Sequence, residues 1–257
     1  MKHLIARVFF LSVLFLLALW SLFAAISVWH FVLVLLVWFL CNLIGSSFIH
    51  LNYHVKAYCS DPSETRNHIA LTFDDGPNPN TLQILDILKK YNVKATFFCI
   101  GKNIGAHPEI LKRIVAEGHI VGNHSYSHSH VFDFYRKNRV IRELKDTDAL
   151  IEKITGKKPL FFRPPYGVTN PSIRRALEVT RHKVIGWNIR SMDGITKNGK
   201  VIFNRILKRI SPGSIVLLHD TRPETAKVLE QLLQTLAEKN YQVVSAEQLL
   251  NLKAYEN

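Results

Sequence analysis

The chain has 257 residues, with 33 Lys or Arg against 20 Asp or Glu, and its formal net charge is +13. Its three cysteines are an odd number and lack metal-ligand spacing, which excludes a disulfide framework and a zinc knuckle. Residues 1–60 contain no Asp or Glu. The roughly 200 residues that follow are enough for one domain with a sizeable core and too few for two ordinary domains.

The first segment, residues 1–56, predicts a membrane anchor of two transmembrane helices. No Lys, Arg, Asp or Glu occurs from Val8 to Phe48, and one crossing needs about 20 apolar residues. A cleaved signal peptide has a much shorter apolar run. We therefore expect a retained helical hairpin with its turn near residues 27–30, where Trp29 and His30 suit the membrane interface.

The charges beside this hairpin predict the side of the membrane on which the remaining chain lies. Lys2 and Arg7 flank one end, and Lys56 and Arg66 flank the other. Basic residues concentrate on the cytoplasmic side, so both flanks are expected there. This predicts an integral protein of a bacterial-type inner (cytoplasmic) membrane, with its domain on the cytoplasmic face. If only one helix crosses the membrane, the domain faces outward instead.

Beyond a polar stretch at 57–67 that is typical of a linker, short apolar runs alternate with longer amphipathic stretches up to residue 257. The expected strands are His68–Phe73, Lys94–Ile100, His119–Gly122, Leu160–Phe162, Lys183–Trp187, Ser214–His219 and Gln242–Val244. The expected helices are Thr81–Tyr91, Pro108–Glu117, Phe134–Thr155, Pro171–Thr180, Lys200–Ile210, Thr225–Lys239 and Ala246–Leu250. This alternation predicts an α/β fold in which about seven parallel strands close into a barrel with helices outside.

Two adjacent carboxylates end the first of these strands. Asp74 and Asp75 follow an apolar run, and Gly76-Pro77 forms a turn directly after them. Carboxylates are costly to place beside a core unless they are paired or bound to a metal. A turn at the strand end can direct both toward one cleft, where one holds a cation and its neighbour accepts protons. The alternative is an Asp-rich turn with a helix N-cap.

Two histidines follow the short strand His119–Gly122. His124 and His128 are four residues apart, so that one helical turn would bring their imidazoles to the same side. Two histidines and one carboxylate, with an open position for water, are a known ligand set for catalytic Zn²⁺, and Asp75 could supply the carboxylate. His130 is expected to take no part, because it cannot share that helical face. Simple surface exposure of the pair is the alternative.

The segment Arg163-Pro164-Pro165-Tyr166-Gly167 ends another expected strand. Its two prolines fix the backbone, and the segment can therefore present the Arg163 side chain and the Tyr166 backbone N–H rigidly. An Arg fork can bind a carboxylate such as Asp74. A stiff loop with a solvated Arg is the alternative reading.

The last third of the domain contains Trp187, Asp193 and His219, the last of which ends an apolar strand. A histidine at that place can act as a general acid. A carboxylate partner would set its tautomer and favour its protonated form; Asp193 is the first candidate and Asp220 the second. All these segments lie at the C-terminal ends of expected strands, where barrels collect their active sites.

Together these residues resemble the polysaccharide deacetylase family, the nodulation-deacetylase (NodB) homology domain or carbohydrate esterase family 4, from about residue 68 to 244. Residues 72–77 match its first motif, which implies that Asp74 is the base and Asp75 a metal ligand. Residues 124–128 match the second, which implies His124 and His128 as further ligands of Zn²⁺ or another divalent ion such as Co²⁺ or Ni²⁺. The family fold is an irregular (β/α) barrel with fewer than eight strands.

The later motifs carry over with one departure. In the third, Arg163 is implied to orient the base and the Tyr166 amide to donate to the oxyanion. In the fifth, Leu217 is implied to line the acyl pocket and His219 to be the acid. The fourth motif usually ends in Asp-Trp, but Asp193-Gly194 stands here. The missing Trp leaves one wall of the acyl pocket in question and allows a different acyl group or a larger substrate.

The resemblance implies a metal-dependent hydrolase that removes the N-acetyl group from an amino sugar in a cell-envelope polysaccharide or lipid-linked glycan. Its site residues would be the catalytic Asp74, Arg163, Tyr166, Asp193 and His219, with Tyr166, Trp187 and Leu217 binding substrate. The alternatives are a deformylase of a lipid-linked amino sugar and a non-catalytic glycan-binding homologue. Residues 61–257 hold 33 − 3 = 30 basic and 20 acidic residues, a net +10 that suits anionic substrates or lipid headgroups. No nucleic-acid recognition motif occurs, so nucleic acid is not expected as a partner.

Overall fold

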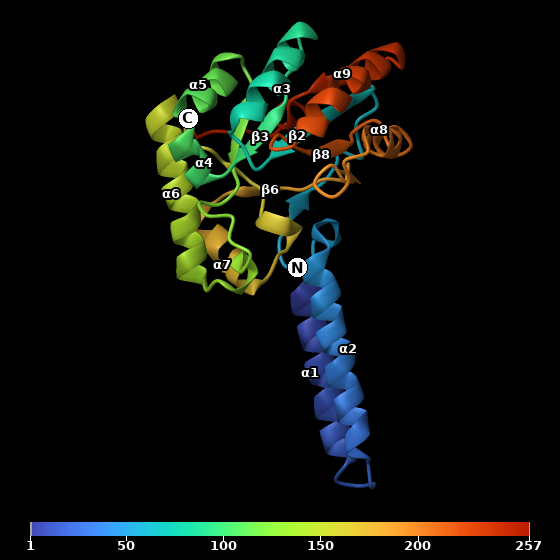
Figure 1. Ribbon diagram of the computed structural model, residues 1–257. Helices are drawn as coiled ribbons and strands as arrows, with labels where there is room; N and C mark the ends of the chain where they lie inside the picture. Colours follow the sequence, from blue (N-terminus) through green and yellow to red (C-terminus); the bar gives the residue numbers. More distant parts are fainter. Residues whose placement is uncertain (1, 257) are drawn as a thin grey trace.

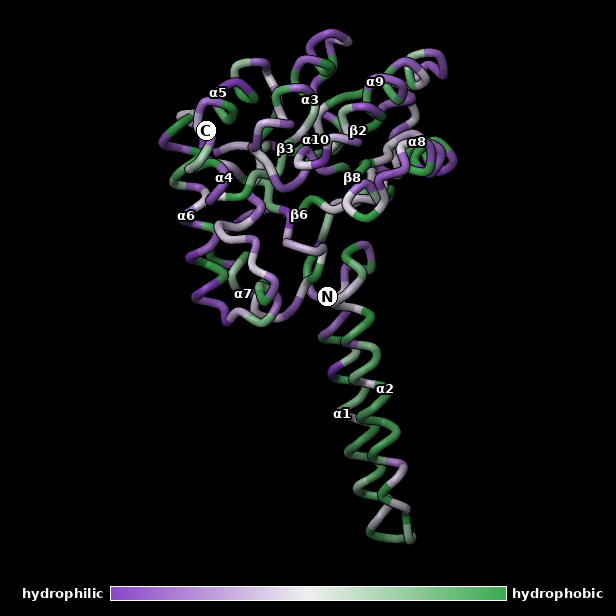
Figure 2. The backbone as a smooth tube through the Cα atoms, viewed as in Figure 1, coloured by the Kyte–Doolittle hydropathy of each residue, from purple (hydrophilic) through white to green (hydrophobic). Residues whose placement is uncertain are grey.

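Two long helices at the start of the chain form a hairpin that projects from the rest of the molecule (Figure 1). In the computed structural model, which describes residues 2–256, α1 (Lys2–Trp20) and α2 (Val28–Ser47) lie side by side. Figure 2 shows apolar residues along nearly their whole length. Each helix is long and apolar enough to cross a membrane. Both open ends of the hairpin lie at the domain, where the His3 amide donates to the Tyr53 carbonyl over 3.2 Å.

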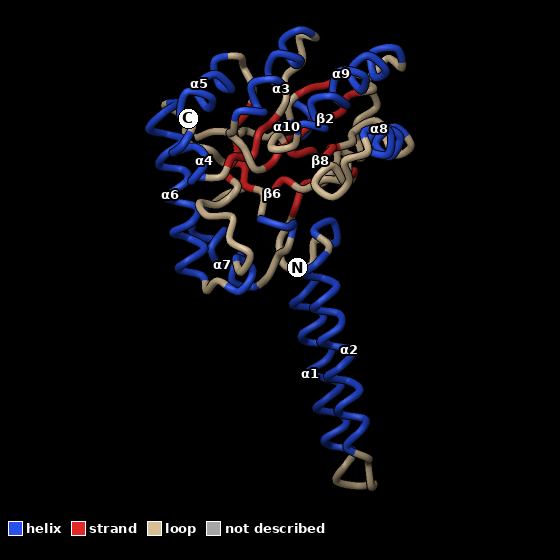
Figure 3. Tube along the Cα trace, in the orientation of Figure 1, coloured by secondary structure: helices blue, strands red, loops and turns tan. Residues whose placement is uncertain are grey.

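A parallel sheet forms the centre of the remaining chain, with helices around it (Figure 3). The strand order is β1-β6-β5-β4-β3-β2-β8-β7, with β9 also paired to β2, and every pairing is parallel. The bounds are β1 (Ala57–Tyr58), β2 (His68–Asp74), β3 (Thr96–Cys99), β4 (Ile120–Asn123), β5 (Phe161–Phe162), β6 (Lys183–Ile185), β7 (Ile189–Arg190), β8 (Ile215–His219) and β9 (Gln242–Val244). The two edge strands β1 and β7 are not paired with each other in the described chain, so that the sheet is curled and open, as in an irregular half-barrel.

Amphipathic helices cover the outer side of this sheet and bury their apolar faces against it. They are α3 (Pro79–Lys90), α4 (Gly101–Ala106), α5 (Pro108–Ala116), α6 (Lys137–Thr155), α7 (Pro171–Thr180), α8 (Gly199–Leu207) and α9 (Pro223–Glu238), with short 3₁₀ turns η1 (Ile49–Leu51), η2 (Phe132–Phe134) and η3 (Pro165–Gly167). The last helix, α10 (Ala246–Leu250), packs instead in a separate core cluster with Ala70 and Phe98, on the other face of the sheet. Phe73 and Phe97 stack at 5.1 Å between ring centroids in the main core, beneath α3 and α5. This packed core fixes the strand ends that carry the polar motifs.

The strand register brings distant motifs to one edge. Asp74 at the end of β2 pairs with His219 at the end of β8, and on its other side with Phe98 of β3. Asn123 at the end of β4 pairs with Phe162, which directly precedes Arg163. Because all these strands are parallel, their carboxyl ends meet in one place.

The fold confirms the predicted α/β class, and all seven predicted strands occur. The predicted linker at 57–67 is wrong in part, because Ala57–Tyr58 form β1 beside β6 and the Asp61 amide donates to the Gly213 carbonyl over 2.9 Å. β7 and α4 were not predicted. Two-residue strands and a six-residue helix are too short to leave a periodic signal in the sequence.

Candidate active site

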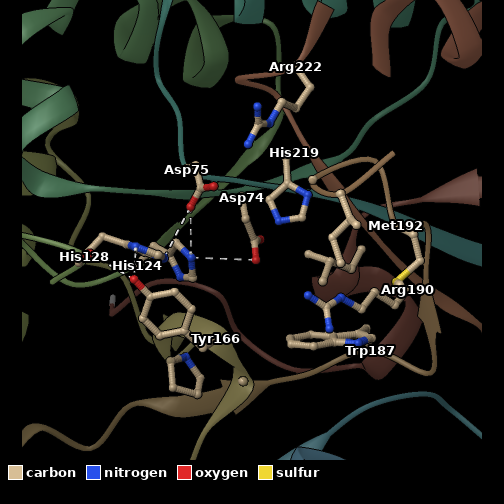
Figure 4. A pocket seen from close by; sticks show the side chains of 15 residues that line it. Asp74, Asp75, His124, His128, Tyr166, Trp187, Arg190, Met192, His219 and Arg222 are labelled. Atoms are coloured by element: carbon tan, nitrogen blue, oxygen red, sulfur yellow. Dashed lines mark hydrogen bonds and ion pairs between the residues drawn. The ribbon is translucent and has the colours of Figure 1, made fainter. Parts of the chain in front are cut away.

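One pocket opens at the carboxyl ends of the strands, and Figure 4 shows the side chains that line it. Its residues come from the ends of β2, β4, β7 and β8 and from the loops that follow these strands and η3. The lining residues are Asp74, Asp75, His124, His128, Pro164, Tyr166, Gly167, Trp187, Arg190, Met192, Gly194, Ile195, Leu217, His219 and Arg222. Most of the residues predicted from sequence therefore meet in a single cavity.

Asp74 is held from behind by Arg163, which is completely buried. The Arg163 Nη1 donates to Asp74 Oδ1 over 2.7 Å and to the Thr72 hydroxyl over 2.8 Å. Its other nitrogens donate to the carbonyls of Ile185 and Gly186. With every arm of the guanidinium in use, Arg163 is a fixed charge that orients one oxygen of Asp74 and leaves the other free.

Asp75, His124 and His128 form a cluster that can hold a metal ion, with one donor atom from each residue and all three atoms within 4.8 Å of one another. Asp75 Oδ1 lies 3.5 Å from His124 Nε2 and 3.4 Å from His128 Nε2. His124 Nε2 is also 3.8 Å from Asp74 Oδ2. In Figure 4 the three side chains point toward one another beside Asp74.

The local backbone of Asp75 is unusual. Its φ of 79° lies in the left-handed region, which a non-glycine residue rarely adopts. The Asn103 side chain of α4 donates to the Asp75 carbonyl over 2.6 Å and helps to hold this conformation. Burial raises the pKa of Asp75, but the hydrogen bond and charge of His124 outweigh it and keep the pKa below its usual range. Asp75 is therefore a carboxylate, the form that binds a cation.

The histidines reach the cluster from a loop. The expected helical turn across His124 and His128 is wrong, because Ser125 and His128 have φ values of 64° and 46°. The imidazole centroids nevertheless lie 4.9 Å apart. His130 lies outside the cluster, as expected, and its Nδ1 is 3.1 Å from the Tyr166 hydroxyl.

The ligand chemistry of this cluster fits a divalent metal such as Zn²⁺. His124 Nδ1 lies 2.7 Å from the Arg163 carbonyl, an arrangement that leaves Nε2 free for a metal. Burial and the neighbouring His124 lower the pKa of His128 to about 4, which keeps its imidazole neutral. Burial also lowers the pKa of His124, yet Asp74 and Asp75 raise it overall. Two carboxylates beside two histidines thus make a site that favours a positive charge.

Helix α6 fixes the histidine loop from outside, which the sequence did not reveal. The Glu143 carboxylate accepts hydrogen bonds from the amides of Tyr126 and Ser127 over 3.1 and 2.8 Å. Asn123 accepts from the Ser125 amide and donates to Asp148 over 2.8 and 2.7 Å. A carboxylate in the middle of an amphipathic helix gives no sequence signal for this role.

His219 is paired with Asp193, the first of its two candidate partners. Its Nδ1 lies 2.7 Å from Asp193 Oδ1, and Asp193 also accepts from the hydroxyls of Ser191 and Thr225. Burial lowers the pKa of His219, but the hydrogen bond that its ring donates to Asp193 and the charge of Asp193 raise the pKa to about 9. The second candidate, Asp220, instead accepts from the Thr81 hydroxyl over 2.7 Å.

The three residues predicted to bind substrate, Trp187, Leu217 and Tyr166, also line the pocket. Trp187 packs so closely on Gly167 that a side chain there would meet the indole at 2.5 Å. Gly194 stands where the family motif has Trp, and a Cβ on it would lie 3.3 Å from the His219 ring. The pocket is therefore lined beside His219 by backbone, Met192 and Ile195, without an indole from the fourth motif.

Two arginines of the pocket, Arg190 and Arg222, were not singled out from the sequence. Neither guanidinium has a hydrogen-bond or ion-pair partner among residues 2–256, and both line the cavity (Figure 4). Arg190 ends β7, which was itself missed, and Arg222 follows His219 by three residues. Their place just after strand ends is the one signal that could have suggested them.

Comparison with known proteins agrees with this geometry. The model of the family described as "Polysaccharide deacetylase" matches residues 61–185. A peptidoglycan-N-acetylmuramic acid deacetylase, PdaC of Bacillus subtilis (strain 168), is 39% identical over 186 residues; the match covers 72% of the chain and 39% of that protein. A peptidoglycan-N-acetylglucosamine deacetylase of Bacillus cereus is 34% identical over 191 residues, with 72% of the chain and 89% of that protein covered.

Solved structures give the same picture. The structure of PdaC from Bacillus subtilis is 38% identical, with a TM-score of 0.68 and coverage of 74% of this chain and 92% of that one. A protein of Bacillus anthracis described as a CE4 family pseudoenzyme is 30% identical, with a TM-score of 0.68 and coverage of 73% and 66%. The similarity covers the α/β domain. The matched structures include a peptidoglycan deacetylase and a protein described as a pseudoenzyme.

Proposed function

The chain belongs to the polysaccharide deacetylase family, and on that premise we propose that it is a metal-dependent hydrolase that removes the N-acetyl group from an amino sugar. The observation that carries the proposal is the convergence in one pocket of three parts. They are the cluster of Asp75, His124 and His128, the buried Asp74–Arg163 pair, and the His219–Asp193 pair. A non-catalytic homologue would be expected to lack at least one of them.

In this proposal each residue has a separate task. Asp74, oriented by Arg163, accepts a proton from the attacking water. The Tyr166 backbone N–H donates to the oxyanion that develops on the acetyl carbonyl. His219, protonated through its pairing with Asp193, donates a proton to the departing amine. Asp75, His124 and His128 would hold Zn²⁺ or a similar ion, which when bound supplies Lewis acidity to this site.

The proposed substrate is an N-acetylated amino sugar that carries a negative charge, in an envelope polysaccharide or a lipid-linked glycan. The relatives are named for N-acetylmuramic acid and N-acetylglucosamine residues of peptidoglycan. Arg190 and Arg222 support the anionic choice, because their unpartnered guanidinium groups face the cavity and can bind a carboxylate or phosphate. No contact in the pocket distinguishes acetyl from formyl, so acetyl is proposed from the relatives' names.

We also propose that α1 and α2 anchor the enzyme in a membrane. Their hairpin returns the chain to the side where it began, and Lys2, Arg7 and Lys56 flank that side. This distribution favours the cytoplasmic face for the domain. A lipid-linked glycan at the inner surface is the substrate that suits this placement.

Acetate release by the purified full chain tests the proposed activity. We expect release from N-acetylated oligosaccharides, faster when the sugar carries a carboxylate, and a loss of about 10²–10⁴-fold in kcat for Asp74→Asn, the contribution typical of a general base. Wild-type rates in Asp74→Asn would contradict the assigned base. Equal kcat/KM for neutral and carboxylate-bearing substrates would contradict the proposed anionic specificity.

A further inference from the structure

Residues 131–139 present apolar and basic side chains to solvent. Phe134 is 86% exposed, which makes it the most exposed large apolar side chain of the described chain after residue 48, and Val131 is 54% exposed. A single exposed apolar residue is ordinary on a soluble surface, but apolar side chains exposed together can mark a contact with a partner or a membrane, and Val131 and Phe134 belong to one turn. The environment of this segment indicates which of the two it meets.

The fold holds Phe134 rigidly outward. Its neighbours Phe132 and Tyr135 are buried in a core cluster with α6 and α7, at 0% and 6% exposure. The η2 turn between them is closed by hydrogen bonds from the Phe134 amide to the Val131 carbonyl and from the Tyr135 amide to the Phe132 carbonyl, both 3.0 Å. Phe134 is thus presented at the tip of an ordered turn whose other aromatic rings are packed inside.

This turn is connected to the end of the hairpin by two hydrogen bonds. The Thr169 amide donates to the carbonyl of Ser46, in the last turn of α2, over 3.0 Å. The next residue, Asn170, donates through its side chain to the Asp133 carbonyl over 2.7 Å. In Figure 1 the lower ends of α6 and α7 lie level with the domain end of the hairpin. If α1 and α2 span a bilayer, Phe134 therefore lies near the bilayer surface.

The charges around the turn favour an anionic surface. Residues 129–142 contain four basic residues, Arg136, Lys137, Arg139 and Arg142, and one acid, Asp133. The three arginines line one hollow on the first turns of α6, together with Glu143 and Asp146. Basic residues beside an exposed aromatic are the pattern that binds the headgroup region of anionic membranes.

We propose that residues 131–139 are a second membrane contact, in which Phe134 and Val131 enter the interface of an anionic phospholipid bilayer and the adjacent arginines bind its headgroups. The proposal rests on the membrane anchoring proposed above. It also bears on substrate access, because His130, directly before this segment, contacts the Tyr166 hydroxyl at the pocket, 3.1 Å away. A domain held down at this point presents its pocket to glycans attached to the bilayer.

Depth-dependent fluorescence quenching tests the contact directly. The full chain is reconstituted into phosphatidylcholine–phosphatidylglycerol vesicles, with and without bromine on the acyl chains near the headgroup. Phe134→Trp is compared with Val201→Trp, a matched control at an exposed valine (49%) on α8, away from the hairpin. The emission of the chain's four own tryptophans is subtracted by using wild type.

We expect the added emission of the Phe134→Trp variant to be blue-shifted and quenched by brominated lipid, and that of Val201→Trp to be neither. Replacing phosphatidylglycerol by phosphatidylcholine should weaken the quenching.

Equal emission and quenching of the two variants would overturn the membrane contact. A blue shift of Phe134→Trp without quenching would also overturn it, because that result indicates a protein partner or a second copy over Phe134. Quenching that does not depend on phosphatidylglycerol would overturn the role of the arginines. A chain that fails to float with vesicles would overturn both anchor and contact, whereas acetate release in detergent tests the hydrolase independently.

Discussion

Asp74 and Asp75 are neighbours in the chain, yet their surroundings differ. Asp74 faces the buried Arg163, which takes one of its oxygens, and Asp75 faces two histidines. The left-handed φ of Asp75 makes this division possible, because it turns the second side chain away from the strand direction toward the histidine loop. The backbone at one residue thereby separates the proposed proton acceptor from the proposed metal ligand.

The pairing of His219 with Asp193 predicts how kcat depends on pH. With a pKa raised to about 9, His219 is protonated below that pH, so we expect the proposed acid catalysis to be lost as the pH rises through about 9. In Asp193→Asn the charge that raises the pKa is removed, and we expect the alkaline limb of the kcat profile to move down toward the ordinary value of 6.5.

The matched control for this prediction is Thr225→Val, which removes one hydrogen bond to Asp193 but keeps its charge. Its alkaline limb should stay close to that of wild type. If Asp193→Asn kept the wild-type limb, His219 would not be the acid that the limb reports.

The polar motifs could be predicted from the sequence because acids and histidines directly after apolar strands are unusual. Arg190, Arg222 and Glu143 have much weaker sequence signals, for a physical reason. Surface arginines and helical glutamates are common in solvated positions, and only the three-dimensional arrangement shows that these face the pocket or the histidine loop.

At the level of elements, helix α6 supports the loop that carries the two histidines proposed as metal ligands. The Glu143 carboxylate of α6 accepts hydrogen bonds from two backbone amides and one hydroxyl of the loop that joins His124 to His128. Glu143→Gln replaces a charged acceptor by a neutral one that also has a donor facing these N–H groups. We expect a loss of about 10–100-fold in Zn²⁺ affinity, as is typical for residues that orient metal ligands, measured by competition with a chelating dye.

The control for this variant is Asp146→Asn, three residues further along the same helix and exposed to solvent. It should bind Zn²⁺ like wild type. Equal affinity in Glu143→Gln and Asp146→Asn would show that the loop keeps its geometry without α6.

The elements themselves were predictable to different degrees. β2, β8 and α9 have clear apolar periodicity and lie close to their expected ranges. The histidine loop was mistaken for a helical turn, because a spacing of four residues suits either a helix or a loop. Ser125 and His128 have left-handed backbone conformations in a loop whose amides donate to Asn123, to Glu143 and to the Ser125 hydroxyl, contacts that sequence reasoning cannot see.

At the level of the whole molecule, the arrangement of the hairpin and the domain predicts on which side of the membrane the domain lies. Because both open ends of the hairpin lie at the domain with basic flanks, we expect the C-terminus to face the cytoplasm. A green fluorescent protein fused after Asn257 should fluoresce in bacterial cells, and an alkaline phosphatase fused at the same position should be inactive. The opposite pair of results would place the domain outside and favour peptidoglycan strands over lipid-linked sugars.

The central claim is that Asp75, His124 and His128 bind one metal ion beside Asp74. Elemental analysis of the full chain, purified after exposure to Zn²⁺ and removal of excess metal, tests it most directly. We expect one equivalent in wild type and in Asp74→Asn, which keeps all three ligands, and far less in Asp75→Asn, His124→Ala and His128→Ala. Full metal content in the three ligand variants, or none in folded wild type, would contradict the account.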